Sequence, residues 1–417
     1  MTTNHKYQIH TDAQGNLVVP LEIVVKFGLK PGTDLLLEET DDEMVFRRPV
    51  SHLAKVYIEP TSKCNLSCRT CIRNVWDEKM GKMSNATFKR ILDGIKELGY
   101  PPSIFFGGFG EPLSHPHIVD MVAEAKKFCS KVELITNGML LNEKLSIDLI
   151  EAGLDTLWVS VDGAKPESYA DVRIGAALPE IFKNIKQYRH QYVLRKWVDP
   201  DIGLAFVAMK RNISDLPLLL KMSTKLGISR YLVTNVLPYT KEMCDEMLYK
   251  RSLDTLVSKP MSWAPGLDLP LIDANQYTID PLIQVMGIRP RNYLTHRKWS
   301  DSIDYCPFVR KGSTAIAWDG NVSPCLPLMH QHESYLKELK RTVKRHVVGN
   351  VKDQSLKVLW ELPEYMDFRK RVDEFDFSPC TVCASCEMAE SNQEDCYGNT
   401  FPTCGGCLWA QGFIRCP

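Results

Sequence analysis

The sequence lacks the features that would mark a membrane-bound, exported or strongly charged chain. No apolar run approaches the roughly eighteen residues that cross a bilayer, and the first ten residues lack the basic-then-apolar order of a secretory signal. Net charge is also absent, because 51 Lys and Arg balance 51 Asp and Glu. The chain as a whole therefore does not collect nucleic acid or anionic lipid by its charge. We expect a cytoplasmic globular protein without a membrane partner.

Cysteine, in contrast, is abundant and clustered. Of 14 cysteines, three lie within eight residues and nine lie between positions 306 and 416, whereas Cys129 and Cys244 stand alone. A reducing cytoplasm keeps structural disulfides open, so the clusters indicate metal ligation. The candidate ligands are Cys64, Cys68, Cys71, Cys306, Cys325, Cys380, Cys383, Cys386, Cys396, Cys404, Cys407 and Cys416.

Residues 1–50 predict a separate small β-rich module. Turn signals at 12–15 and 30–32 separate short apolar runs, with one short helix at 21–28. The pattern resembles half of a swapped-hairpin barrel of the AbrB or MazE type, a family that usually dimerises and often binds DNA. Acidic residues at 38–43 would repel phosphates, so DNA binding is disfavoured. We favour a dimerisation or partner-docking module, which would make the protein a homodimer.

Residues 51–237 alternate between apolar strands and helices. The predicted strands are 54–60, 103–108, 131–138, 155–163, 202–209 and 230–236, and Ser84, Asn142 and Ser214 are predicted helix caps. This alternation predicts an α/β fold with a parallel sheet covered by helices. Six units without a glycine-rich dinucleotide turn favour a partial (βα)6 TIM-like barrel. Its chemistry would lie at the C-terminal ends of the strands.

The remainder of the chain divides into two further regions. Residues 238–305 hold a helical piece at 242–256 and then a proline-rich stretch, which we interpret as a linker that packs near the barrel mouth. Residues 306–417 predict a β-hairpin at 313–325, a helix near 356–369 and a cysteine-rich tail. The tail has few periodic apolar residues, so we expect a metal to hold it folded.

The segment CNLSCRTC directly follows the first barrel strand. It places Cys64, Cys68 and Cys71 in a C-x3-C-x2-C array at the catalytic end of the barrel. Three close thiolates are one short of a closed 4Fe-4S site, which leaves one iron open to another ligand. A zinc knuckle with a distant fourth ligand is the alternative for this array by itself.

With this array in place, residues 53–238 resemble the radical S-adenosylmethionine (radical SAM) superfamily. The resemblance implies that the three cysteines hold a 4Fe-4S cluster whose open iron takes the amino and carboxylate groups of S-adenosylmethionine. GGFGEP resembles the Gly-Gly-Glu-Pro motif of the family, TNG matches its third strand, and YADVRIG carries an arginine suited to a carboxylate. The implied cofactor contacts are Gly107, Gly108, Glu111, Asn137, Ser160, Asp162 and Arg173. Thr70 departs from the family, which usually has an aromatic residue there, so the adenine contacts are not assigned.

The C-terminal third resembles the SPASM extension of peptide-modifying and protein-modifying members. Cys306, Gly320 and Cys325 meet its opening pattern, but the later cysteine spacing departs from the standard. Nine cysteines are one more than two auxiliary 4Fe-4S clusters require, which leaves one spectator. A zinc ribbon from the pairs at 380/383 and 404/407 is the alternative. It gives the early pair no role, so auxiliary clusters are favoured. His330 and His332 are candidate ligands or acid-base groups.

The resemblance implies an enzyme that reductively cleaves S-adenosylmethionine and abstracts hydrogen from a protein, peptide or cofactor precursor, with ferredoxin or flavodoxin as electron donor. CRTCIRNVWDEKMGKM and CGGCLWAQGFIRCP are similar to maturases of tungsten-containing aldehyde oxidoreductases, our leading interpretation. Leu326 replaces the aspartate of sulfatase-maturing members, which argues against that activity. The second interpretation is cross-linking of a ribosomal peptide. An iron-sulfur DNA-binding redox sensor and a zinc-stapled scaffold are the alternatives from other classes.

Overall fold

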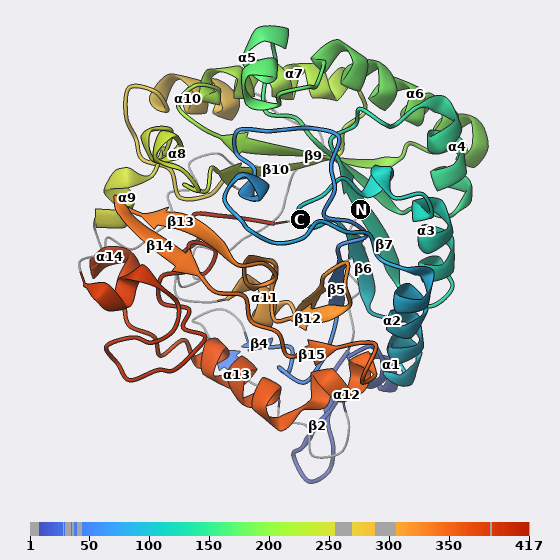
Figure 1. Cartoon of the computed structure of the whole chain (residues 1–417). Coiled ribbons are helices and arrows are strands. Elements are labelled where there is room, and N and C mark those ends of the chain that lie inside the picture. The colour runs from blue at the N-terminus through green and yellow to red at the C-terminus, as the bar shows by residue number, and fades with distance from the viewer. Residues whose placement is uncertain are drawn as a thin grey trace.

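A computed structural model describes residues 8–27, 29, 35, 37–39, 44–254, 269–287, 306–383 and 386–416. Three predicted features lie outside these residues: the turn at 30–32, the acidic residues at 41–43, and most of the proline-rich stretch before residue 269. Figure 1 shows strands in the middle of the molecule and helices around them.

Six neighbouring parallel strands form the wall of a partial barrel. They are β5 (Lys55–Ile58), β6 (Ser103–Phe106), β7 (Lys131–Thr136), β8 (Thr156–Ser160), β9 (Asp201–Ala208) and β10 (Arg230–Asn235). Each strand pairs in parallel with the next one along the chain. The strands are almost entirely buried, as expected for a parallel sheet with helices on its outer face. The predicted α/β partial barrel is confirmed.

Helices of the strand–helix units cover the outer face of this wall (Figure 1). They are α2 (Asn85–Glu97), α3 (Ile118–Lys126), α4 (Glu143–Glu151), α5 (Pro166–Val172), α6 (Leu178–Lys196) and α7 (Leu216–Lys225). Ser84 and Asn142 cap α2 and α4 through their side chains, as predicted. The predicted Ser214 cap is wrong, because a 3-10 turn η3 (Ile213–Asp215) precedes α7. Asp215 takes the cap position, and its carboxylate accepts the Ala164 N–H at 2.9 Å instead.

The region predicted as a linker contains three helices among its described residues: α8 (Lys241–Asp245), α9 (Lys250–Asp254) and α10 (Ile279–Gly287). The predicted helical piece at 242–256 is therefore two helices. Asp273 explains where α9 starts, because its carboxylate accepts the N–H groups of Arg251 and Ser252 at 2.8 and 2.9 Å. Helix α10 packs against α7 on the outside of the barrel.

The C-terminal region continues the barrel sheet. Its elements are α11 (Pro307–Arg310), β11 (Ser313–Ile316), β12 (Asn321–Ser323), η4 (Leu326–Leu328), β13 (His332–Leu336), β14 (Leu339–Val343), β15 (Gly349–Asn350), α12 (Leu356–Glu361), α13 (Pro363–Glu374), α14 (Cys380–Cys383) and η5 (Glu387–Glu390). The predicted hairpin is confirmed as β11 and β12. Strand β11 also pairs in parallel with β5 and extends the wall of the barrel. The helix predicted near 356–369 is divided, because Pro363 holds Leu362 in an extended conformation.

The end of the chain fills the open side of the six-stranded barrel. Asn235 at the end of β10 donates to the Phe413 carbonyl at 3.0 Å, and the Arg415 N–H donates to Thr234 at 2.8 Å. Phe413 shares a buried apolar cluster with Tyr57 of β5, inside the barrel. The C-terminus accordingly lies near the centre of the view in Figure 1. This packing removes water from an interior that six strands would leave open.

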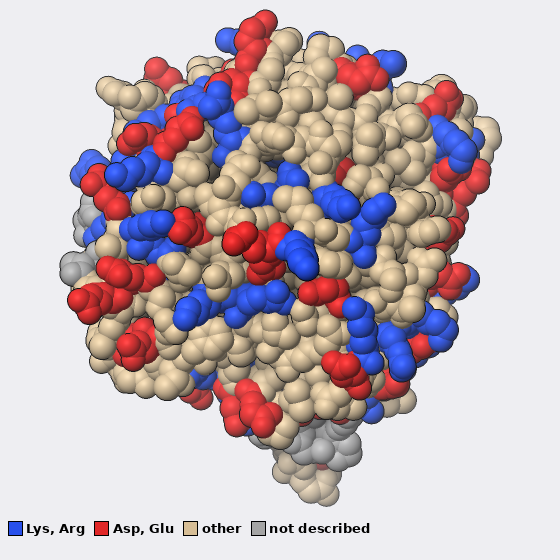
Figure 2. Space-filling view, in the orientation of Figure 1, with Lys and Arg blue, Asp and Glu red and all other residues tan. Residues whose placement is uncertain are grey.

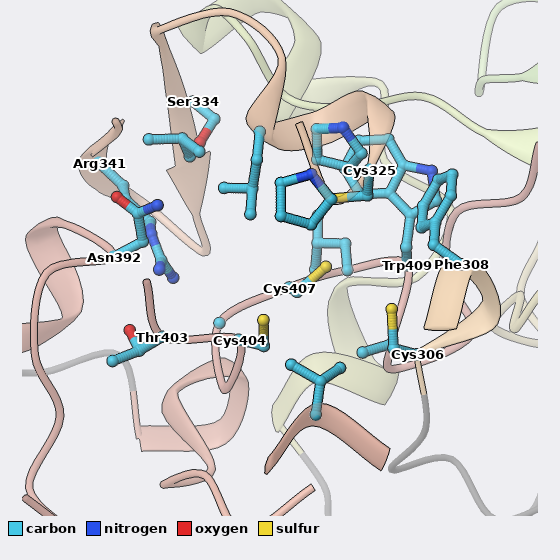
Figure 3. Close-up of a pocket in the computed structure, with 18 of the residues that line it drawn as sticks. Cys306, Phe308, Cys325, Ser334, Arg341, Asn392, Thr403, Cys404, Cys407 and Trp409 are labelled. Carbon is cyan, nitrogen blue, oxygen red and sulfur yellow. The ribbon is translucent and has the colours of Figure 1, made fainter. Parts of the chain in front are cut away.

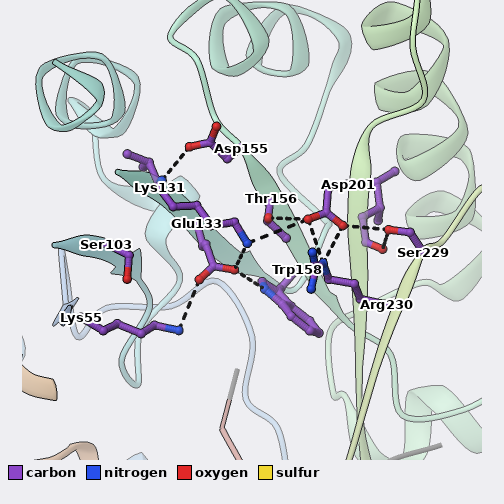
Figure 4. A network of polar contacts seen from close by, with 12 residues as sticks. Lys55, Ser103, Lys131, Glu133, Asp155, Thr156, Trp158, Asp201, Ser229 and Arg230 are labelled. Carbon is purple, nitrogen blue, oxygen red and sulfur yellow. Dashed lines mark hydrogen bonds and ion pairs between the residues drawn. The ribbon is translucent and has the colours of Figure 1, made fainter. Parts of the chain in front are cut away.

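A layer of charged side chains closes the opposite end of the barrel, at the beginnings of the strands (Figure 4). Glu133 of β7 accepts from Lys55 at 3.3 Å and from the Trp158 indole at 3.4 Å. Asp201 at the start of β9 pairs with Arg230 at the start of β10 at 2.7 Å. The chemistry of such barrels lies at the other end, so this layer supports the fold.

Among the described residues that precede the barrel, the chain forms two strand pairs and one helix. They are β1 (His10–Thr11), β2 (Leu17–Val18), α1 (Leu21–Lys26), β3 (Leu37–Glu39) and β4 (Met44–Phe46), and both strand pairs are antiparallel. The order of elements agrees with the prediction, whereas dimerisation stays a prediction. Figure 2 shows charges of both signs interspersed over one face of the molecule. Across the described residues, no helix combines the length and apolarity that crossing a membrane requires.

Candidate functional site

The three-cysteine loop lies at the C-terminal end of β5 and meets two arginines. The Arg73 Nε donates to the Cys71 Sγ at 3.2 Å, and the Arg173 Nη1 lies 3.9 Å from the Cys68 Sγ. The backbone N–H of Leu66 donates to the Cys64 Sγ at 3.4 Å. Each sulfur therefore faces a hydrogen-bond donor, and two of the donors are cationic, which favours negative charge on the sulfurs.

Burial raises the pKa of Cys64 and Cys68, although Arg73 and Arg173 oppose the shift. A bound metal would keep such thiols deprotonated. Over the described ranges, no three His, Cys, Asp or Glu side chains gather as closely as the ligands of a single metal ion do. Three thiols with cationic donors around them are the donor set of an iron-sulfur cluster with one open iron.

Asp162 and Arg173 form a buried ion pair beside the cysteine loop. The Arg173 Nε lies 2.5 Å from one carboxylate oxygen of Asp162, and the Val207 N–H donates to the other at 2.8 Å. Asp162 is fully buried. Burial opposes the positive charge of Arg173, but Asp162, Cys68 and Tyr169 together outweigh burial and raise the pKa of the guanidinium. Ser160 lies at the end of β8, and its carbonyl accepts the Tyr169 hydroxyl at 3.5 Å. The pair fixes a permanent cation at the cluster loop.

Glu111 ties the GGFGEP loop to the end of β7. Its carboxylate accepts the Thr136 hydroxyl at 2.7 Å, the Asn137 N–H at 2.8 Å and the Leu113 N–H at 3.0 Å. Burial raises the pKa of Glu111, although these three hydrogen bonds act to lower it. Asn137 extends the link, because its amide donates to Asn65 in the cysteine loop at 2.8 Å. The predicted contacts Glu111 and Asn137 are thus brought together next to Cys64, and their direct contact with a cofactor stays a prediction.

Glycines allow the GGFGEP loop to approach its neighbours closely. Gly108 has a positive φ of 94°. A Cβ on Gly110 would overlap the Thr61 carbonyl oxygen and lie 2.7 Å from that of Lys63. Glycine is therefore required at position 110, which the sequence interpretation missed when it selected Gly107 and Gly108. The sequence feature that could have identified Gly110 is its place directly before Glu111 in the motif.

A buried imidazole links the barrel mouth to the C-terminal region. The His330 Nε2 lies 3.0 Å from Glu59 at the end of β5, and its Nδ1 lies 2.7 Å from Glu78 after the cysteine loop. One carboxylate faces each ring nitrogen, and an ionised carboxylate only accepts hydrogen bonds. Both ring nitrogens therefore carry a hydrogen, so His330 is protonated. Burial lowers its pKa, but the two carboxylates outweigh burial and raise it to about 9. Sequence reasoning proposed His330 as an acid-base candidate and missed Glu59, the residue that directly follows the strand.

The triad of Glu59, His330 and Glu78 predicts that the stability of the fold depends on pH. The folded-state pKa of His330 is about 9 and the ordinary value is 6.5. The stabilisation is therefore full below about pH 6.5 and is lost as the pH rises through 9, by at most about 3 kcal/mol. The charged and titratable groups facing the ring are Glu59, Glu78, Arg345 and His332. Urea unfolding at pH 6 and pH 10 should show a larger loss for wild type than for His330→Gln. Parallel pH curves would contradict the protonated triad.

A second group of thiols surrounds a cavity in the C-terminal region. Cys306, Cys325, Cys404 and Cys407 all line this cavity of about 70 Å3, and Figure 3 shows their sulfurs around it. Burial raises the pKa of Cys306 to about 12 and also raises that of Cys325. The structure thus brings the early pair of cysteines together with the late CGGC pair, from which they are separated by about eighty residues in the sequence.

Arg341 of β14 lines the same cavity. Its surroundings indicate whether these residues fit an iron-sulfur cluster. It is 5% exposed, and its Nε and Nη1 atoms have no hydrogen-bond partner within the described residues. Buried donors without an acceptor are costly. A cluster with four thiolates and sulfides is anionic and rich in acceptors, so the thiols and the guanidinium together fit such a group. Sequence reasoning missed Arg341, although the alternation of Leu339, Arg341 and Val343 along a strand indicates one shared face.

The remaining cysteines lie apart from this cavity. Cys380 is buried, accepts from or donates to Ser378 at 3.0 Å, and lies close to Cys396. Cys383, Cys386 and Cys396 are exposed. Cys416 does not line this cavity: its Sγ accepts the Trp409 indole N–H at 3.2 Å, and its thiol interacts electrostatically with Lys55 and Cys407.

Models of two known families match separate parts of the chain. Residues 58–195 match the model of the radical SAM superfamily, and residues 306–387 match that of the SPASM iron-sulfur cluster-binding domain. The chain is 31% identical, over 87% of its length and 96% of the relative, to the tungsten-containing aldehyde ferredoxin oxidoreductase cofactor-modifying protein of Pyrococcus furiosus. It is 29% identical to the PqqA peptide cyclase of Granulibacter bethesdensis, over 43% of this chain and 46% of that protein.

Solved structures share the fold at low sequence identity. SuiB of Streptococcus suis, bound to S-adenosylmethionine, has a TM-score of 0.51 at 16% identity and covers 83% of this chain and 73% of its own. The protein anSMEcpe with bound AdoMet has a TM-score of 0.53 at 17% identity and covers 80% of this chain and 86% of its own.

Proposed function

Because the chain belongs to the radical SAM superfamily and carries a SPASM domain, we propose that this enzyme acts in the maturation of a tungsten-containing aldehyde oxidoreductase. The observation that carries the proposal is the 31% identity to a cofactor-modifying protein over 96% of that relative. Membership of this enzyme family decides against the DNA-binding sensor and the zinc scaffold. We place the enzyme in the cytoplasm, where thiols stay reduced.

The cofactors are a 4Fe-4S cluster with S-adenosylmethionine and auxiliary iron-sulfur clusters. When bound, the first cluster supplies one electron that cleaves S-adenosylmethionine, and the 5'-deoxyadenosyl radical released takes hydrogen from the substrate. Cys64, Cys68 and Cys71 would hold this cluster. Arg173, held by Asp162 beside Cys68, supplies a fixed positive charge that suits the methionine carboxylate. Glu111 orients the loop that would meet the methionine by accepting the backbone N–H of Asn137, directly after β7.

Two other parts of the chain exclude water from the reaction space. The C-terminal segment around Phe413 fills the open side of the barrel, and the Lys55–Glu133 layer closes its far end. A buried site prevents a reactive radical from meeting solvent. This function for the tail is supported by its hydrogen bonds to Thr234 and Asn235 at the end of β10.

We assign the auxiliary ligands by their grouping in the structure. Cys306, Cys325, Cys404 and Cys407 would hold one cluster, since they line one cavity. By elimination, Cys380, Cys383, Cys386 and Cys396 would form the second set of four. Cys416 would then be the spectator, because it does not line this cavity and its Sγ accepts the Trp409 indole N–H.

The proposed substrate is more specific than membership of the family alone would indicate. The tungsten enzyme, or the pterin precursor of its cofactor, would be the partner, with ferredoxin or flavodoxin as electron donor and the N-terminal module as docking or dimerisation unit. Cross-linking of a ribosomal peptide is the second candidate, supported by the relative named PqqA peptide cyclase. That similarity covers 43% of this chain, whereas the first relative covers 87%.

Co-expression tests the proposed function. A tungsten-containing aldehyde oxidoreductase, produced with this chain, with its Cys64→Ala variant or without it, should be active when the wild-type chain is present. We expect equal amounts of tungsten enzyme protein in all three cultures, because the chain acts on the cofactor or its insertion. Equal aldehyde-oxidising activity in all three cultures would refute the proposal and leave peptide modification as the next candidate. The Cys129→Ala variant is the control, since that cysteine stands alone.

A further inference from the structure

Arg341 occupies an unusual position for an arginine on a two-stranded hairpin. Strand β14 pairs with β13, and along β14 Lys340 is exposed, Arg341 is buried and the other three residues are partly buried. Lys340 is exposed and pairs with Glu333 at 2.7 Å, whereas Arg341, the next residue, is 5% exposed and turned into the thiol-lined cavity. Figure 3 shows its guanidinium beside Cys404. Lys340 and Arg341 are therefore adjacent in the sequence, but the first is exposed to solvent and the second is buried.

No carboxylate neutralises Arg341 among the described ion pairs. Its Nε and Nη1 are buried without a hydrogen-bond partner there. Arg173, also buried, has Asp162 as its ion partner. A buried charge without a counter-charge costs several kcal/mol. The groups that share the cavity with Arg341 include the thiols of Cys404 and Cys407.

The CGGC segment is built around this guanidinium. A Cβ on Gly406 would overlap the Arg341 Nη1, and a Cβ on Gly405 would overlap the Ser378 carbonyl oxygen. Position 405 therefore needs glycine against the backbone of residue 378, and Gly406 leaves room for the guanidinium. This close packing places the cation against the backbone between Cys404 and Cys407, which line the same cavity.

We propose that Arg341 is the counter-ion of the auxiliary cluster held by Cys306, Cys325, Cys404 and Cys407, and that it raises the reduction potential of this cluster. The inference rests on the ligand set proposed above. Reduction adds one negative charge to the cluster, and a buried cation nearby stabilises that charge. Net charge and hydrogen bonds to the sulfurs are known determinants of cluster potential. Arg341 would act through the cluster and is therefore a positioning residue.

The test is a potentiometric titration with dithionite, followed by electron paramagnetic resonance, on anaerobically purified full-length protein. Arg341→Gln should shift the midpoint potential of one auxiliary cluster to a more negative value. Arg341→Lys, which keeps the charge, should stay closer to wild type. Lys340→Gln removes the same charge one residue away on the solvent face and should leave every midpoint unchanged. Unchanged potentials in Arg341→Gln with full iron content would overturn the proposal.

Iron analysis separates this inference from its premises. If Arg341→Gln loses iron, Arg341→Lys should retain both the iron and the potential, and iron loss in both variants would overturn the counter-ion assignment. Cys404→Ala should remove the auxiliary signal that Arg341→Gln shifts; if it does not, the ligand set is wrong. Neither measurement uses the tungsten enzyme, so a negative co-expression result leaves this inference standing.

Discussion

Replacement of Cys64, Cys68 and Cys71 together by alanine should lower the iron content from about twelve to about eight per chain and abolish the formation of 5'-deoxyadenosine. The three thiols follow β5 and face the donors Arg73 and Arg173 and a backbone N–H. The auxiliary cysteines lie on separate elements of the C-terminal region, so their clusters should persist. Iron and sulfide analysis and chromatography of reaction mixtures with dithionite measure both effects.

The matched control for this variant is the double replacement of Cys129 and Cys244 by alanine. Both cysteines are buried, and burial raises the pKa of Cys129 to about 12 and that of Cys244 to about 11. They behave as small apolar side chains, so the control should keep full iron and full nucleoside formation. Nucleoside formation that survives in the triple variant would contradict the assignment of the active cluster.

Replacement of Glu133 by alanine should lower the free energy of unfolding by about 3–5 kcal/mol, because it leaves the nearly buried Lys55 without its counter-charge. Glu133 lies 3.3 Å from Lys55 and 2.9 Å from Lys131, and both members of the Lys55 pair are nearly buried. Burial already lowers the pKa of Lys55 to about 8 in the presence of Glu133. Without Glu133 we expect Lys55 to lose its proton near neutral pH. Urea unfolding followed by tryptophan fluorescence measures the loss.

An exposed pair provides the comparison for Glu133. Glu180 lies 3.3 Å from Lys183 on α6, and both side chains are largely exposed to solvent. Glu180→Ala should therefore change the free energy of unfolding by less than about 1 kcal/mol. Equal effects of the two substitutions would show that the charged layer at the base of the barrel contributes no more than a surface pair.

The barrel could be predicted because its signals are local. Each apolar run was short and bounded by turn residues, and the Ser84 and Asn142 caps make the hydrogen bonds that their residue types suggest. The cysteine loop was predicted for the same reason, since its three ligands lie within eight residues. Ser214 failed as a cap because tertiary contacts of the neighbouring Asp215 with α5 and its entry decide where α7 begins.

The second thiol group could not be predicted because its members come from distant segments. Spacing suggested ribbon-like pairs among the late cysteines, whereas the cavity combines Cys306 and Cys325 with Cys404 and Cys407. Arg341 was equally hidden: in the sequence it lies in a basic stretch with Lys340 and Arg345. Only the pairing of β13 with β14 separates the buried cation from its exposed neighbour.

The most direct test of the central claim is the metal content of anaerobically prepared wild-type protein, combined with an assay for methionine and 5'-deoxyadenosine after reduction in the presence of S-adenosylmethionine. We expect about twelve irons per chain, little zinc, and formation of both products only under reducing conditions. Zinc in place of iron, with neither product formed, would contradict a radical enzyme and leave a metal-stapled scaffold.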